Sequence, residues 1–189
     1  MPTRPTSAGR GPYLADLFGG VGAVFLERSV RVISDQGHGG ALWIVRDPSA
    51  LANSGVRIGV RVNDVGPALL DRKYDERVRW LETIGHLGGI DGAVVLDGSA
   101  RLLGFGAFIP TPGDALVFRY HKDKGPTMSS ASTIGGGRHR SAIQFCAACA
   151  PAAAYVVSED GRISFFASDR PNSIPLCAEI VSLGVPSIL

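Results

Sequence analysis

Three consecutive glycines, 135–137, lead directly into the basic triplet Arg138-His139-Arg140, and an apolar pattern of helical spacing begins at Ile143. Glycine lets a backbone approach a ligand closely, and a helix start next to it directs free N–H groups into the loop. Two guanidinium groups, which are always charged, add donors whose geometry suits a phosphate. The pattern predicts a phosphate-binding turn followed by a helix. A solvated basic turn in front of an ordinary helix has the same spacing.

A carboxylate stands at the start of a continuous apolar run. Asp91, Gly92 and Ala93 lead into Val94-Val95-Leu96, and such a run predicts a buried strand, here over 91–97. Asp91 would then be held on a rigid scaffold, where it suits a divalent metal or a proton from a hydroxyl. Taken alone, Ile-Asp-Gly is also an ordinary turn into a strand.

A third polar group follows the basic triplet. Residues 154–166 predict a strand, a tight turn at Asp160-Gly161 and a second strand. Ser158 and Glu159 would lie where the first strand ends. Polar residues are common at hairpins, so this pair gains meaning only from the other two groups.

Together and in this order, the three groups resemble the diadenylate cyclase (DAC) domain family over roughly residues 85–167. The resemblance implies a mixed sheet wrapped by helices. It also implies that two domains face each other and join two ATP molecules into cyclic di-AMP, so that a homodimer forms at least transiently.

The resemblance also assigns roles to residues. Asp91 would lie beside Mg²⁺ or Mn²⁺ and the attacking 3′-hydroxyl, and Arg138, His139 and Arg140 would hold the phosphates as further catalytic residues. Residues implied to line the nucleotide are Gly92, Ala93, Gly104, Gly136, Gly137, Ser158 and Glu159. Gly104 enters because its strand would border the adenine.

Two functions remain open at this point. All three groups keep their charged residues, which favours an enzyme. Gly137 stands where the family usually has Thr, the link over 110–135 is long, and no transmembrane helix or large DNA-binding extension is apparent. These departures favour a sensor that binds ATP or a cyclic dinucleotide without turning it over. Residues 38–45 and 103–107 are similar to a divergent, sensor-like branch of the family. A purely structural domain would not need the three groups together.

Composition narrows the class of protein. Of 189 residues, 45% are hydrophobic and 19% charged, which predicts a globular chain with one domain. A net charge of +2 argues against general nucleic-acid binding. No signal peptide or membrane-spanning run is apparent, and the three cysteines predict reduced thiols in a cytoplasm. Cys146 and Cys149 have the spacing of a zinc pair, but a buried helix stripe is the simpler interpretation.

The elements that must position these residues predict one α/β domain with a mixed sheet over 12–189, after a loose tail at 1–11. Glycines inside the 101–109 strand indicate close packing or close ligand approach, with Leu103, Phe105 and Ala107 on one face. We expect helices at 13–30, 69–87 and 142–150, strands at 30–33, 41–45, 56–62, 91–97, 101–109 and 115–120, a mobile loop at 121–133 and a final helix or strand at 176–183.

Overall fold

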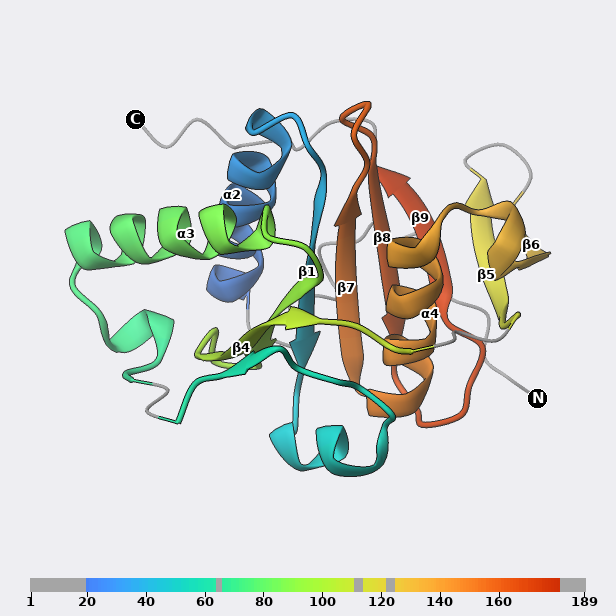
Figure 1. The fold of residues 1–189 in the computed structure, drawn as a ribbon, viewed down its shortest axis with the longest axis horizontal. Coiled ribbons are helices and arrows are strands. Elements are labelled where there is room, and N and C mark those ends of the chain that lie inside the picture. Colours follow the sequence, from blue (N-terminus) through green and yellow to red (C-terminus); the bar gives the residue numbers. More distant parts are fainter. Residues whose placement is uncertain (1–19, 64–65, 111–113, 122–124, 181–189) are drawn as a thin grey trace.

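The computed structural model describes residues 20–63, 66–110, 114–121 and 125–180. They form a mixed sheet flanked by helices, as predicted (Figure 1). The helices are α2 (Gly20–Asp35), α3 (Tyr74–Gly88) and α4 (Gly137–Cys149). The strands are β1 (Gly40–Val45), β2 (Val60–Arg61), β3 (Ala93–Asp97), β4 (Leu102–Ala107), β5 (Leu116–His121), β6 (Gly125–Ser130), β7 (Ala152–Val157), β8 (Ile163–Ser168) and β9 (Leu176–Ile180).

The sheet combines parallel and antiparallel pairs in the order β2-β4-β3-β1-β7-β8-β9-β5-β6. At its centre β1 pairs in parallel with β3 and antiparallel with β7. All residues of β1, β3 and β7 are buried, as expected for strands covered on both faces. This central group is the rigid scaffold from which the loops at the sheet's end project.

Helices cover both faces of the sheet. Along β1, Leu42 and Ile44 pack in the cluster that α2 and α3 cover, whereas Ala41, Trp43 and Val45 point into the cluster under α4. The period of two in a strand produces this division. Figure 1 shows α2 and α3 together on one side of the sheet and α4 lying across β7 and β8.

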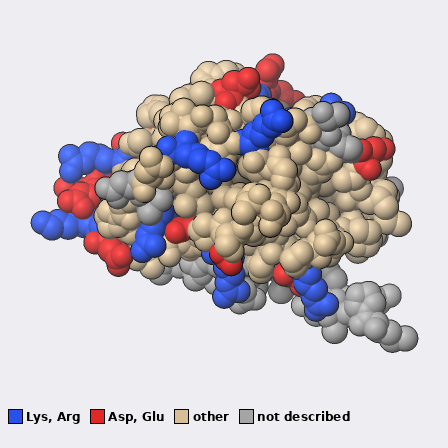
Figure 2. Space-filling model, turned by 60° about the horizontal axis from the view of Figure 1, so that its bottom comes forward, with Lys and Arg blue, Asp and Glu red and all other residues tan. Residues whose placement is uncertain are grey.

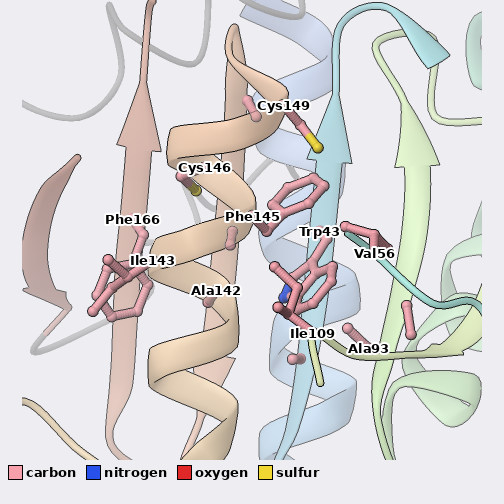
Figure 3. Close-up of a cluster of buried hydrophobic side chains, with 14 of the residues drawn as sticks. Trp43, Val56, Ala93, Ile109, Ala142, Ile143, Phe145, Cys146, Cys149 and Phe166 are labelled. Atoms are coloured by element: carbon pink, nitrogen blue, oxygen red, sulfur yellow. The ribbon is translucent and has the colours of Figure 1, made fainter. Parts of the chain in front are cut away.

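The cluster under α4 fixes the helix through an aromatic pair (Figure 3). The Trp43 and Phe145 rings stack with their centroids 4.7 Å apart and their planes 18° from parallel. Cys146 and Cys149 are free and buried beside them, and burial raises the pKa of both thiols. They therefore pack as small apolar groups, which agrees with the helix-stripe interpretation.

Two element predictions were wrong. Val30–Ile33 is not a strand, because α2 continues to Asp35 and buries Leu26, Val30 and Ile33 on one helical face. The region 121–133 is not a loop throughout, because β6 pairs with β5 residue for residue and a 3-10 helix follows at Ala131–Thr133. In both places tertiary contacts outweigh local propensity: burial of one helical face for α2, and strand pairing for β6.

The predicted faces of the 101–109 strand were correct for Leu103 and Ala107 but wrong for Phe105. Leu103 and Ala107 pack in the cluster under α4, but Phe105 lies against the opposite cluster. The register of β4 with β3 shifts twice, as in a β-bulge, and each shift turns the following side chains to the other face.

Other boundaries moved less. The 69–87 helix begins as a 3-10 turn at Leu69–Asp71 before α3, and the 56–62 strand is reduced to β2 with an isolated bridge at Arg57. The final element is a strand, β9. The predicted tail at 1–11 and the end of the final element beyond 180 lie outside the described residues.

Candidate functional site

The basic triplet lies in the first turn of α4, because the helix starts at Gly137, five positions before the predicted start at 142. Gly136 is the N-cap in extended conformation, and no described side chain caps the free N–H groups of this turn. The helix begins with the hydrogen bond that the Arg140 N–H donates to the Gly136 carbonyl at 3.2 Å. Positive side chains oppose the positive end of the helix dipole. The helix start thus concentrates positive potential.

Asp91 lies in the bend between α3 and β3. The strand was predicted to start at Asp91, but it starts two residues later, at Ala93. The Asp91 side chain is fully exposed, with Oδ1 accepting a bond from the Gly92 N–H at 3.0 Å. The same oxygen lies 4.0 Å from Nη2 of Arg138. An acid and a cation 47 positions apart in the chain therefore meet in space.

Two glycines make this approach possible. Gly92 has φ +96°, and a Cβ there would lie 2.6 Å from the Gly106 carbonyl carbon, so any side chain would push the Asp91 bend away from β4. Gly39 has φ +70°, and a Cβ there would come within 3.2 Å of Arg138 Nη1 and of the Glu159 backbone nitrogen. The missing side chain at Gly39 thus leaves the space in which the Arg138 guanidinium rests.

Two hollows open on either side of Arg138. The first, of about 410 Å³, lies against the β7–β8 hairpin, and we call it the hairpin hollow. The second, of about 520 Å³, has apolar walls that include Trp43, and we call it the aromatic hollow. Gly137 and Arg138 line both. One guanidinium can therefore reach a ligand in either hollow.

The hollows divide the predicted site residues between them. The hairpin hollow is lined by Gly136, Gly137, Arg138, His139, Ser158 and Glu159. The aromatic hollow is lined by Asp91, Gly92, Ala93, Gly137, Arg138 and Arg140. Gly104 lines neither of them. It packs inside the sheet, where a Cβ would meet the Ile58 side chain and the Val60 carbonyl, so close packing accounts for this glycine.

His139 differs from its two arginine neighbours. Its ring is partly buried, with Nε2 3.3 Å from the Ser164 hydroxyl and its edge against Phe166. Burial lowers the pKa of His139 below its ordinary value, and the nearby Arg162 and Arg138 guanidiniums lower it further. The imidazole is therefore neutral at pH 7. It can donate or accept a hydrogen bond, but the positive charge of the triplet comes from the two arginines.

An additional acid lies close to Arg140. The Ser130 hydroxyl and the Ser132 N–H donate to the Asp114 carboxylate and lower its pKa, and the charge of Arg140 contributes to the same shift. Asp114 belongs to the 110–135 link, in which no site residue was predicted from the sequence. Its carboxylate is ionised near neutral pH and balances part of the charge of Arg140.

Sequence reasoning missed several residues that line the hollows. Trp43, Phe108 and Ile109 supply the apolar wall of the aromatic hollow, and Asp160 extends the hairpin hollow. The signal that could have found Trp43 is its bulk within the otherwise aliphatic strand Ala41–Val45. Figure 2 shows basic and acidic side chains interspersed over one face, with large uncharged areas between them.

The residues that line the two hollows could bind a metal ion only together with a phosphate ligand. Within the described ranges, no group of three or more His, Cys, Asp or Glu side chains could hold a metal. Mg²⁺ is often bound by one or two carboxylates together with substrate phosphates and water. Asp91, exposed and next to Arg138, fits that mode but not a site made of protein ligands alone.

Comparisons with known proteins bear on the fold. The structure is similar to the crystal structure of a hypothetical membrane spanning protein from Bacillus cereus, with a TM-score of 0.51, 22% identity and 88% of this chain covered. This chain spans 66% of that protein's length, slightly less than two thirds. A double mutant of DacA from Staphylococcus aureus gives a TM-score of 0.46 at 16% identity, covering 86% of this chain and 89% of that one.

The first of these similarities concerns the α/β fold alone. No protein-family model matches the chain, and no curated protein matches it. In the described part of the chain, no helix combines the length and apolar character needed to span a bilayer.

Proposed function

We propose that this domain binds an adenine nucleotide across the two hollows, with Arg138 holding the phosphates between them. The observation that carries the proposal is the meeting of Asp91 and Arg138 at 4.0 Å, beside a helix start without a side-chain cap. Free N–H groups and guanidiniums together suit a phosphate chain. Ser158 and Glu159 lie across the hairpin hollow, where they can contact the sugar or the phosphates.

We further propose that the bound nucleotide reacts, and that two ATP molecules are condensed into cyclic di-AMP. The 3′-hydroxyl oxygen of one ATP attacks the α-phosphorus of the other, and a new P–O bond forms. The bond from that phosphorus to the β-phosphate oxygen breaks, and pyrophosphate leaves. The hydroxyl proton passes to Asp91 or to water. A second, identical transfer closes the ring.

Both nucleotides must be present for this chemistry. Because the two hollows share one Arg138 and only the aromatic hollow contains Asp91, one copy of the domain would hold one ATP, and a second copy would present the other across a two-fold interface. Asp91 would hold Mg²⁺ or Mn²⁺ together with the phosphates. The ion would neutralise phosphate charge and lower the pKa of the attacking hydroxyl.

A second candidate function is binding without turnover. Gly137 is the observation that favours it, because the first turn of α4 has no hydroxyl at this position and no described atom lies within 4 Å of where a Cβ would be. A sensor of ATP or of a cyclic dinucleotide would use the same arginines without needing that hydroxyl.

Turnover separates the two candidates. Purified protein is incubated with ATP and Mn²⁺, and the products are separated by chromatography. For the enzyme we expect a cyclic dinucleotide that is lost in Asp91→Asn but not in Asp75→Asn, an exposed carboxylate on α3. For the sensor we expect binding by calorimetry without product. Absence of nucleotide binding in the folded wild type would refute the proposal as a whole.

A further inference from the structure

The aromatic hollow contains two buried donors without partners. Trp43 is 1% exposed, and its indole nitrogen has no hydrogen-bond partner among the described residues. The Nε of Arg140 is likewise buried and unpaired among them. Both residues line the aromatic hollow. Buried donors are nearly always paired in folded proteins, so two orphans beside one hollow require an explanation.

Packing alone does not require a tryptophan here. The Trp43 ring stacks on Phe145, and a phenylalanine could make the same contact. Figure 3 shows the indole nitrogen on the edge of the ring nearer to α4, away from the stacked face. The other tryptophan provides the contrast, because the Trp80 indole donates to the Ala100 carbonyl at 3.2 Å. Trp43 thus carries a donor that no described residue of the free protein uses.

The walls of the hollow limit what can accept this bond. Ala41, Ala93, Ala107 and Ile109 line the hollow with apolar surface together with Trp43, while Arg138 and Asp91 add charged groups to its lining. A phosphate fits the charged part. A flat, largely apolar ring with an acceptor atom at its edge fits the part next to Trp43.

We infer that Trp43 is a specificity-determining residue whose indole N–H donates to a ring nitrogen of the purine base in the aromatic hollow. The inference rests on the proposed nucleotide binding and adds which part of the ligand is selected and by which atom. A base without an acceptor at that edge would leave the donor unpaired, and discrimination of this kind is stronger than that from apolar contacts alone.

The test combines ligand and protein changes, and it is read by calorimetry. ATP is compared with 1-deaza-, 3-deaza- and 7-deaza-ATP, each of which lacks one ring-nitrogen acceptor. We expect wild type to bind one analogue about three- to tenfold more weakly than ATP, the range for a neutral hydrogen bond. Trp43→Phe should bind ATP more weakly by a similar factor and should no longer distinguish that analogue. Trp80→Phe is the matched control and should behave like wild type.

Each outcome decides the inference. It is overturned if wild type binds all three analogues as tightly as ATP, a measurement that needs no mutant and so does not depend on the folding of Trp43→Phe. It is also overturned if Trp43→Phe keeps the discrimination, while nucleotide binding itself then stands. If wild type binds neither ATP nor any analogue, the proposed function fails together with the inference.

Discussion

The first turn of α3 carries Asp75 and Glu76, whereas the first turn of α4 carries three basic residues and no acid. In α3 the Glu76 carboxylate accepts a bond from the Lys73 N–H at 3.4 Å, and both acids favour the positive end of the dipole. In α4 the cap residue is Gly136, which offers no side chain. One helix start is satisfied by its own residues, and the other is left open.

The difference shows how the domain can tolerate an unfavourable helix start. Six residues of α4 are buried, and its stack of Phe145 on Trp43 anchors it to the sheet centre. Tertiary packing therefore maintains the helix, since packing rather than local propensity supplies most helix stability in proteins. The first turn is then free to carry charge for a ligand. The predictions below test this division between stability and binding.

The largest expected effect is the loss of Arg138. We predict that Arg138→Ala weakens ATP binding by about 1.5–3 kcal/mol, the range for a hydrogen bond to a charged group. Isothermal titration calorimetry measures the change, and circular dichroism checks the fold. Arg79→Ala on α3 is the control, because Arg79 is 72% exposed and pairs with its helix neighbour Asp75. Equal losses in both variants would mean that diffuse charge, and not the start of α4, attracts the nucleotide.

The same contrast explains what the sequence could predict. Arg138, Asp91 and Glu159 could be proposed as site residues from the sequence, because charged residues at glycine-rich ends of predicted elements suggest chemistry before any contact is known. The bulk of Trp43 in an aliphatic strand was a local signal, but its role, like that of Gly39, depends on which strand lies under α4. That arrangement follows from β1 lying between β3 and β7, a tertiary fact with no local signal.

The errors in the fold have similar physical causes. Val30 and Ile33 favour a strand by their β-branched type, but their spacing from Leu26 is helical, and burial against the sheet decides the outcome. β6 has the composition of a loop, with glycine, proline and serines, and exists because β5 offers a complete ladder of partners. Gly104 was assigned to the nucleotide because strand glycines have two explanations, and the contacts with β2 match the packing one.

A smaller effect is expected at the start of α3. We predict that Glu76→Ala lowers the free energy of unfolding by about 0.3–1 kcal/mol, because it removes a carboxylate from the first turn. Urea denaturation measures this change, and ATP affinity should stay the same. Glu82→Ala is the control, since Glu82 lies in mid-helix and its exposed pair with Arg28 at 3.7 Å contributes little. A change in ATP affinity in Glu76→Ala would show that the two helix starts are not independent.

The smallest effect is expected for Gly136→Ser. This substitution is the most discriminating one, because it gives the start of α4 a side-chain cap and so makes it resemble the start of α3. A Cβ at Gly136 would have no described atom within 4 Å, and the backbone there is extended, so serine fits without strain. The hydroxyl introduced by Gly136→Ser would accept a bond from the N–H of Arg138 or His139, and we predict a gain in unfolding free energy of a few tenths of a kcal/mol.

The same substitution should weaken the binding of ATP. An N–H already bonded to the introduced hydroxyl is no longer free for a phosphate, so we expect Gly136→Ser to weaken ATP binding about twofold, as calorimetry would measure, while thermal unfolding moves upward. Gly136→Ala adds the same Cβ without the oxygen and should show neither change. Opposite shifts in stability and affinity from one hydroxyl would mean that the bare cap serves the ligand. A stability gain with unchanged affinity would mean that the phosphates do not touch this turn.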